Sequence, residues 1–176
     1  MNFIETKLKD LYVIEPEAFR DERGIFARTY CKKEFAQINF DKEIVQINFS
    51  YNNIKGTLRG LHYQPAPYEE TKLIRCTSGK VFDVAVDLRK SSDTYLDWYG
   101  IELSPENMRM ILIPGGFAHG FITLKDNSGL IYHHTEYYNP SAEKGIRYDD
   151  KTINIEWPVE ITVISDKDNN YEFIKN

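Results

Sequence analysis

The sequence has few cysteines and lacks long apolar runs. Only Cys31 and Cys76 are cysteines, and they form no CxxC pair, so a disulfide framework is excluded. No stretch approaches the roughly 18 apolar residues that a membrane-spanning helix requires. Charges are scattered from Glu5 onward, which leaves no apolar signal core near the N-terminus. We therefore expect a cytoplasmic protein without a membrane partner.

Positive charge is also in deficit. The 176 residues include 22 Lys and Arg against 27 Asp and Glu, a formal net charge of −5. An acidic balance argues against nucleic acid as a partner. The length suits one domain with one sizeable core. We expect residues 1–176 to form that single domain.

The aromatic content and the turn pattern favour β structure. The chain has 12 Tyr, 10 Phe and 2 Trp. Short strand-like runs cover residues 45–49, 57–63, 72–77, 81–88, 98–103, 108–113, 121–124 and 130–138. Strands without helices between them predict an all-β antiparallel sandwich or barrel.

Three further local features can be predicted: one hairpin, one helical run and the packing of the C-terminal stretch. The dipeptide Ser78-Gly79 predicts a hairpin between the runs 72–77 and 81–88. Only residues 31–38 read as helical. The polar stretch from Asp166 to Asn176 is expected to pack loosely over the body.

Polar and apolar residues alternate on several predicted strands. Gly60, His62 and Gln64 share one face, because alternate residues of a strand point the same way. Lys72 shares its face with Ile74, which places a charge among apolar neighbours. A buried lysine is rare unless it is paired or functional. This pattern predicts that Lys72 points into a barrel.

Two more pairs of polar residues share a strand face. Tyr132 lies on the same face as His134, and Gln46 on the same face as Asn48. Polar groups that line an interior are costly unless they bind something. The pairs therefore indicate a ligand pocket.

Two motifs resemble those of the cupin superfamily, whose fold is a double-stranded β-helix (jelly-roll) barrel. The spacing Pro114-x-Gly116-x-x-His119 resembles the second cupin motif. The first motif, His-x-His followed by Glu and Gly, is matched by His62-Tyr63-Gln64, Glu69 and Gly79. A glutamine thus replaces one histidine ligand, which argues against a metal site.

Longer runs resemble one family of sugar-nucleotide epimerases, the dTDP-4-dehydrorhamnose 3,5-epimerases. The runs are DERGIF (21–26), RGLHYQ (59–64), KLIR (72–75), DVAVDLR (83–89), GFAHGF (116–121), Tyr132, YYNP (137–140) and ISDKD (164–168). The resemblance implies an isomerase, without cofactor or metal, that acts on a nucleoside-diphosphate 4-keto-6-deoxyhexose. It would invert C3 and C5, converting dTDP-4-dehydro-6-deoxyglucose to dTDP-4-dehydrorhamnose for a surface polysaccharide.

The implied reaction assigns four catalytic residues. Both carbons flank the C4 ketone, so inversion needs a base, an acid on the other face and a cation beside the enolate oxygen. By resemblance, His62 is the base and Asp168 orients it. Tyr132 is the acid, and Lys72 stabilises the enolate.

The resemblance also implies substrate-binding residues. They are Arg23, Phe26, Gln46, Asn48, Arg59, His119 and Tyr138. An arginine suits a diphosphate because its planar donors pair with two oxygens at once. Strict alternation turns Arg59 away from His62, and a β-bulge at Gly60 would reconcile the two.

The resemblance implies a homodimer with shared active sites. In this family the N-terminal segment crosses to the neighbouring subunit. We therefore expect residues 1–30, approximately, to be exchanged, so that Arg23 and Phe26 serve the partner's site. Phe26 and Tyr138 would stack on the nucleotide base.

The chain departs from the family pattern at a few positions. Arg28 occupies the place of a glutamate, and Tyr148 that of a tryptophan. His133 and His134 replace a lysine and a small hydroxyl residue. His134 either adds a proton carrier or reshapes the sugar pocket, but the interpretation we favour is a histidine at the barrel rim.

Three alternatives remain open from the sequence. One is an epimerase that inverts only C3 or only C5 of a CDP-, GDP- or dTDP-linked 4-keto sugar. Another is a metal-dependent cupin with His62, His119 and His134 on one ion, against which Gln64 and the nearby charge of Lys72 argue. The third is a non-catalytic sugar-nucleotide binding module, which the intact acid–base set disfavours.

Overall fold

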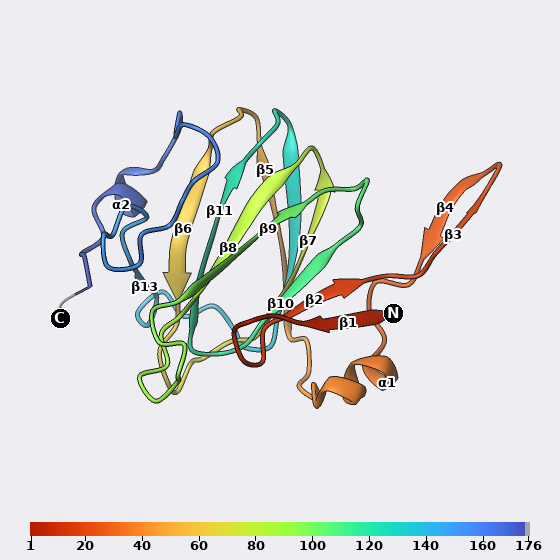
Figure 1. The fold of residues 1–176 in the computed structure, drawn as a ribbon, viewed down its shortest axis with the longest axis horizontal. Coiled ribbons are helices and arrows are strands. Elements are labelled where there is room, and N and C mark those ends of the chain that lie inside the picture. Colours follow the sequence, from red (N-terminus) through yellow and green to blue (C-terminus); the bar gives the residue numbers. More distant parts are fainter. Residues whose placement is uncertain (175–176) are drawn as a thin grey trace.

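A computed structural model describes residues 1–174, and two antiparallel sheets face each other in it (Figure 1). The six-stranded sheet has the order β1 (Asn2–Glu5), β2 (Tyr12–Glu15), β10 (Met110–Ile113), β7 (Lys72–Ser78), β12 (Ser128–His134) and β5 (Gln46–Asn52). The five-stranded sheet has the order β13 (Lys144–Gly145), β6 (Leu58–Tyr63), β11 (Phe117–Thr123), β8 (Val81–Asp87) and β9 (Trp98–Leu103). The predicted all-β jelly-roll fold is confirmed.

The remaining elements are short. Strands β3 (Ala18–Asp21) and β4 (Gly24–Ala27) form a separate hairpin. The helices are α1 (Lys32–Phe35), the 3-10 turn η1 (Ala36–Ile38) and α2 (Asp166–Asn169). The helical run predicted at 31–38 therefore corresponds to α1 and η1.

The core lies between the two sheets, where alternate residues of each strand face the opposite sheet. From the six-stranded sheet, Ile74, Cys76 and Leu130 are fully buried, as are Val81 and Ala85 from the five-stranded one. Such interdigitated inner faces are the usual source of stability in a sandwich. Outside the six-stranded sheet, a second cluster gathers around Phe35 of α1.

The predicted hairpin at Ser78-Gly79 is wrong. Strand β7 pairs with β10 and β12, whereas β8 pairs with β9 and β11, so this turn crosses from one sheet to the other. Gly79 has a φ of +67°. A hairpin turn within one sheet and a connection between two sheets can both use a glycine at positive φ. The local sequence therefore does not distinguish them. The connections β9 to β10 and β11 to β12 cross in the same way.

Several strand boundaries also differ from the prediction. The run 121–124 is the end of β11, which begins at Phe117, and the run 130–138 leaves the sheet after His134. In the stretch that begins at Asp166, α2 buries Asp168 to 4% exposure, whereas most of the other side chains are exposed. Residues 175–176 of that stretch lie outside the described residues.

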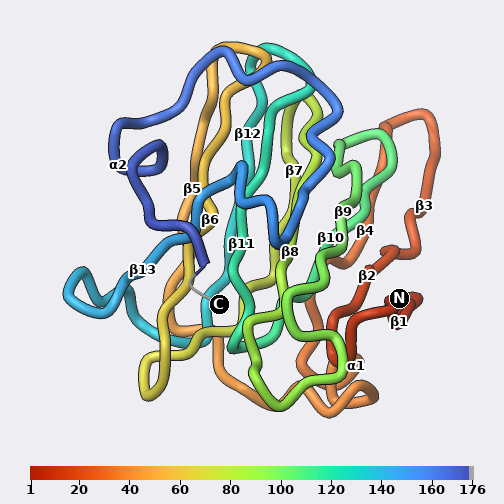
Figure 2. Tube along the Cα trace, turned by 60° about the vertical axis from the view of Figure 1, so that its left-hand side comes forward, coloured from red at the N-terminus to blue at the C-terminus, as the bar shows by residue number. Residues whose placement is uncertain are grey.

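The hairpin of β3 and β4 projects from the barrel, on the side away from α2 (Figures 1 and 2). Its aromatic side chains are exposed to solvent, Phe19 to 69% and Phe26 to 74%. The outer face of β5, an edge strand, also exposes apolar side chains, including Ile47 and Phe49 at 62% each. No helix among residues 1–174 is long and apolar enough to cross a membrane.

Candidate active site

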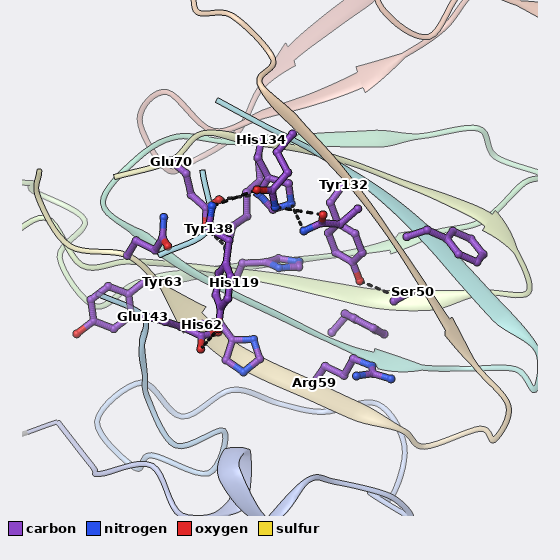
Figure 3. A pocket seen from close by; sticks show the side chains of 16 residues that line it. Ser50, Arg59, His62, Tyr63, Glu70, His119, Tyr132, His134, Tyr138 and Glu143 are labelled. Carbon is purple, nitrogen blue, oxygen red and sulfur yellow. Dashed lines mark hydrogen bonds and ion pairs between the residues drawn. The ribbon is translucent and has the colours of Figure 1, made fainter. Parts of the chain in front are cut away.

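A cavity of about 290 Å³ opens at one end of the barrel, between the two sheets (Figure 3). The predicted residues that line it are Gln46, Asn48, Arg59, His62, Lys72, His119, Tyr132 and Tyr138. Asp168 lies behind His62. Arg23 and Phe26 do not line it, because they belong to the projecting hairpin. The volume is near the lower limit for a ligand pocket, so a sugar nucleotide would extend beyond the mouth.

The pocket is polar because the inner face changes character along each strand. On β7, Lys72 lies at the mouth and Ile74 follows on the same face in the core. On β12, Tyr132 lies in the pocket and Leu130 in the core. The same alternation of side chains thus builds the apolar end and the reactive end of the barrel. The predicted inward direction of Lys72, which is 8% exposed, is confirmed.

His62 and Asp168 form a hydrogen-bonded pair. Nε2 of His62 lies 2.8 Å from Oδ1 of Asp168, and Oδ2 accepts a bond from the amide of Gly60 at 3.0 Å. Burial raises the pKa of Asp168, but the bonds from His62 and Gly60 outweigh it and hold the pKa below its usual value. The ionised carboxylate fixes Nε2–H, which leaves Nδ1 of His62 as the basic nitrogen.

A β-bulge places Arg59 in the same pocket as His62. Between β6 and β11, His119 lies opposite His62 and Phe121 opposite Arg59, so the register shifts in between. Two residues of β6, Gly60 and Leu61, therefore lie opposite the single residue Gly120 of β11. The bulge reverses the alternation, as expected from the sequence. Arg59 lines the cavity, with Nε donating to Asn52 at 2.8 Å.

Tyr132 faces the cavity from the opposite sheet. Its hydroxyl lies 2.9 Å from the hydroxyl of Ser50. Burial raises the pKa of Tyr132, and the hydrogen bond to Ser50 only partly offsets it. The phenol therefore stays protonated and is available as a proton donor near neutral pH. Its ring contacts the rings of His119 and His134 at centroid distances of 6.1 and 6.2 Å.

Glu70 joins two side chains of the six-stranded sheet. Oε1 lies 3.0 Å from Nζ of Lys72, and Oε2 lies 2.6 Å from Nδ1 of His134. Burial raises the pKa of Glu70, but the bond from His134 and the charge of Lys72 outweigh it, so the pKa is lowered. His134 is the last residue of β12 and pairs with Lys72, the first residue of β7, so it lies at the barrel rim as predicted. Its side chain is buried to 7% exposure because it follows the inward face of Tyr132.

His119 pairs with a buried carboxylate. Its Nε2 lies 3.0 and 2.9 Å from the two carboxylate oxygens of Asp83, which is fully buried. Burial lowers the pKa of His119, although the charge of Asp83 opposes this shift. His119 is therefore neutral near pH 7 and offers polar contact without adding a cation.

The polar residues at the mouth are linked through one edge of the sheet. Gln46 donates from Nε2 to Oδ1 of Asn48 at 3.1 Å and accepts from the amide of Tyr138 at 3.1 Å. The hydroxyl of Tyr138 donates to Glu143 at 3.1 Å, and Glu143 also pairs with Lys167. Lys167 belongs to α2, so the mouth of the pocket is tied to the element that carries Asp168.

Sequence reasoning did not select four polar residues of the site. They are Ser50, Glu70, Asp83 and Glu143. Ser50 shares the face of Asn48 on β5, so alternation indicated it, whereas Glu70 precedes β7 and lies outside any strand. Arg28 lies apart from the pocket and pairs with Glu34 at 2.7 Å. Within residues 1–174, no group of three or more His, Cys, Asp or Glu side chains is arranged to hold a metal ion.

Comparisons with known proteins agree on one family. The sequence profile of the dTDP-4-dehydrorhamnose 3,5-epimerases matches residues 5–176. The chain is 49% identical to the enzyme of that name from Shigella flexneri, over 97% of this chain and 94% of the relative.

Two solved structures are also similar. The 3,5-epimerase of Bacillus anthracis, with TDP and PPi bound, has a TM-score of 0.95 at 42% identity, covering 98% of this chain and 99% of the other. The enzyme of Legionella pneumophila, in complex with dTDP-4-keto-L-rhamnose, has a TM-score of 0.93 at 41% identity, covering 98% and 92%.

Proposed function

This chain belongs to the dTDP-4-dehydrorhamnose 3,5-epimerase family, and on that premise we propose how its residues perform the reaction. It is an isomerase that acts on dTDP-4-keto-6-deoxyglucose in dTDP-rhamnose biosynthesis. The reaction inverts C3 and C5 on either side of the C4 ketone. One observation carries the proposal: His62 and Tyr132 enter one pocket from opposite sheets, so a sugar between them meets a different group on each face (Figure 3).

His62 is the base in this scheme. Its Nδ1 removes the proton from C3, and in the second half of the reaction from C5, because Nε2 is held by Asp168 at 2.8 Å. The electron pair of the C–H bond becomes an enolate with its charge on the C4 oxygen. Asp168 stabilises the imidazolium that forms and keeps the ring in one orientation.

The enolate oxygen needs a positive partner that is already in place. Lys72 supplies it, since its ammonium group lies at the polar end of β7 and is held by Glu70 at 3.0 Å. A cation in a pocket that excludes water stabilises a developing oxyanion more strongly than it would in bulk water. The neutral His119 and the guanidinium of Arg59 complete the polar lining.

Tyr132 returns a proton to the carbon from the other face, which inverts the centre. Each inversion moves one proton from carbon to His62 and one from Tyr132 to carbon. Both residues regain their starting states by exchange with water, so the reaction needs no oxidant, reductant or cofactor. Solvent hydrogen is therefore incorporated at C3 and at C5.

The nucleotide lies toward the mouth of the pocket, near Gln46, Asn48 and Tyr138. We propose that a second protomer completes this end with Arg23 and Phe26. The projecting hairpin of β3 and β4 does not line the pocket of its own chain, and it leaves apolar side chains exposed.

The exposed outer face of β5 offers the complementary surface. It lies at a free sheet edge, and Ile47 and Phe49 are each 62% exposed on it. Apolar side chains gathered in this way are typical of an interface. A homodimer that exchanges residues 1–30, approximately, would cover both surfaces.

Proton NMR in deuterium oxide tests the reaction directly. With dTDP-4-keto-6-deoxyglucose, the wild type should remove the H3 and H5 signals and form the 4-keto-rhamnose product, and His62→Ala should abolish both. Loss of only one signal would make the enzyme a single-centre epimerase. No loss of either would reject this substrate, and CDP- and GDP-linked 4-keto sugars would be tested next.

A further inference from the structure

A chain of hydrogen bonds runs along the rim of the six-stranded sheet, from the start of β7 past the end of β12 to the start of β5, and all of its members line the pocket. It starts at Lys72, beside the ketone in the proposed reaction, and passes through Glu70 to Nδ1 of His134. From the other ring nitrogen, Nε2, it continues to Nδ2 of Asn48 at 3.3 Å. Asn48 in turn accepts from Gln46 at 3.1 Å. His134 thus touches both the carboxylate of the ion pair with Lys72 and the amide of Asn48, which faces the nucleotide in the proposed function.

The chemistry of the neighbours fixes the tautomer of His134. The carboxylate of Glu70 only accepts hydrogen bonds, so Nδ1 of His134 carries the proton and donates it. The amide nitrogen of Asn48 only donates, so Nε2 presents its lone pair and accepts. The two ring nitrogens therefore have different partners and different tasks. A neutral imidazole satisfies both at once.

The bond from His134 controls how Glu70 faces the lysine. Without it, both carboxylate oxygens of Glu70 are free to turn onto the ammonium group of Lys72. A carboxylate that pairs fully with Lys72 would neutralise the cation that the enolate needs. With Oε2 held at 2.6 Å by His134, only Oε1 contacts Lys72, at 3.0 Å. Both side chains of that ion pair are nearly buried, at 10% and 11% exposure, so solvent screens it little.

The bond to Asn48 acts on the neighbouring strand, β5. Asn48 is fixed by Gln46 on one side and by His134 on the other. An amide held at both ends is preorganised for its ligand, which lowers the entropy lost on binding.

We propose that His134 is a positioning residue with two separable tasks, holding Glu70 for catalysis by Lys72 and holding Asn48 for binding of the nucleotide. This inference rests on the proposed function for its first task. It extends that function because neither Glu70 nor His134 belongs to the set of residues that handle protons in the reaction.

Two amide substitutions separate the tasks. In His134→Asn, the side-chain NH₂ takes the place of Nδ1–H and keeps the bond to Glu70, while the contact with Asn48 is lost. In His134→Gln, the longer side chain reaches the place of Nε2 and accepts from Asn48, while the bond to Glu70 is lost. The measurements are kcat and KM by NMR, and the Kd of dTDP by calorimetry.

The two variants should move different constants. His134→Asn should raise KM and the Kd of dTDP about tenfold and keep kcat within roughly threefold of wild type. His134→Gln should lower kcat about tenfold or more, since a hydrogen bond to a charged group is lost, and leave the Kd of dTDP unchanged.

The adjacent His133 provides the matched control. It lies on the outer face of β12, with Nδ1 3.2 Å from the carbonyl oxygen of Leu73, and it does not line the pocket. His133→Asn should change neither kcat nor the Kd of dTDP. Thermal unfolding of every variant checks that the fold persists. If His134→Gln fails to fold, Glu70→Gln replaces it: the amide still accepts from His134 but no longer holds the ammonium group of Lys72 in place by charge, so kcat should fall with an unchanged Kd of dTDP.

Two results would overturn the proposal. Equal changes of kcat and Kd in both variants would show that His134 only supports the fold of the pocket, and no change in either would show that it does nothing. An inactive wild type is a different result, because it rejects the proposed function. The Kd of dTDP would then still test the second task, since only His134→Asn should raise it.

Discussion

Nε2 of His62 lies 2.8 Å from Oδ1 of Asp168, although 106 residues separate the two in sequence. His62 belongs to a strand of the five-stranded sheet and Asp168 to a short helix packed beside it. The N-cap of that helix, Ser165, accepts a bond from the amide of Asp168 at 3.1 Å and fixes the carboxylate in place. The pair is therefore preformed before any substrate arrives.

Removing the charge of Asp168 should slow the reaction with little effect on the fold. In Asp168→Asn the amide no longer stabilises an imidazolium, so kcat should fall on the order of 10²- to 10⁴-fold. Asp166→Asn is the control, because Asp166 is exposed on the same helix and its side chain does not line the pocket. Deuterium incorporation by NMR measures both. Equal rates in the two variants would remove Asp168 from the mechanism.

Tyr132→Phe should separate proton exchange from inversion. His62 still removes and returns the proton on its own face, so deuterium should enter C3 or C5 while the inverted product forms at least about 10²-fold more slowly. The NMR experiment reports both processes in one sample. Tyr137→Phe, at a side chain that is 65% exposed, should behave like wild type. Inversion at the wild-type rate in Tyr132→Phe would assign the acid to another group.

A charge on the outer face of β5 should prevent dimer formation. Phe49→Asp would place a carboxylate at the centre of the proposed interface, and light scattering after gel filtration should then give the mass of a monomer. Ile54→Asp is the control, at a residue that is also exposed, at 52%, but lies in the turn after β5. A monomeric wild type would contradict the interface outright.

Shared active sites make a further prediction for mixed dimers. Arg23→Ala and His62→Ala should each be inactive alone. After the two are unfolded together and refolded, up to roughly a quarter of the wild-type activity should return, since half of the dimers are mixed and each has one intact site. If Arg23 served its own chain instead, the mixture would stay inactive.

Gly60 should not tolerate a side chain. Its φ is +121°, and a Cβ there would lie 2.6 Å from Cα of Gly120 and 2.8 Å from the carbonyl oxygen of His119. Gly60→Ala should lower the free energy of unfolding by about 3 kcal/mol or more, because the neighbouring backbone cannot move away. Gly24 has a similar φ of +119° with nothing within 4 Å of the added atom, so Gly24→Ala should cost only about 1 kcal/mol. Urea unfolding compares the two, and equal costs would show that the contact with Gly120 is not limiting.

Stability should fall in acid through a buried carboxylate. Burial raises the pKa of Asp87, but the bonds from Arg89, Ser92 and Thr94 outweigh it and hold the pKa below its usual value. The folded state thus binds this proton less readily than the unfolded state. The stabilisation is complete above the unfolded pKa of about 3.9 and is lost as the pH falls through the lower, folded pKa. Urea unfolding between pH 7 and pH 2 should show this loss, and Asp87→Asn should be less stable at pH 7 with a shallower slope in acid.

Alternation along single strands predicted much of the pocket. It predicts that Lys72, Tyr132 and Asn48 point inward, and the structure confirms each direction. Strict alternation gives the wrong direction for Arg59, because the bulge at Gly60 turns the Arg59 side chain to the same side as His62. Period-two patterns describe one strand at a time, so they are reliable wherever the ladder is regular.

The remaining features depend on contacts that a local pattern does not contain. The turn at Ser78-Gly79 has the chemistry of a hairpin, yet which sheet receives β8 is decided by its pairing with β9 and β11. Alternation from Tyr132 puts His134 on the inward face, but it does not reveal the partner of His134, because Glu70 lies 64 residues away in sequence. The two side chains meet only because β12 pairs with β7, and Glu70 lies just before β7.

The register of β12 has a consequence for how the length of the chain is allowed to vary. Tyr132 and His134 point into the barrel and His133 points out, and the ladders to β5 and β7 hold all three in step. If one residue were inserted in the preceding turn and the turn kept its shape, β12 would slip by one position, so that His133 would point inward and Tyr132 and His134 would point outward. Two inserted residues would keep the direction of every side chain. Before β12, a change of the turn length by one residue is therefore expected to be more damaging than a change by two, because only the first exchanges the inner and outer faces of the strand.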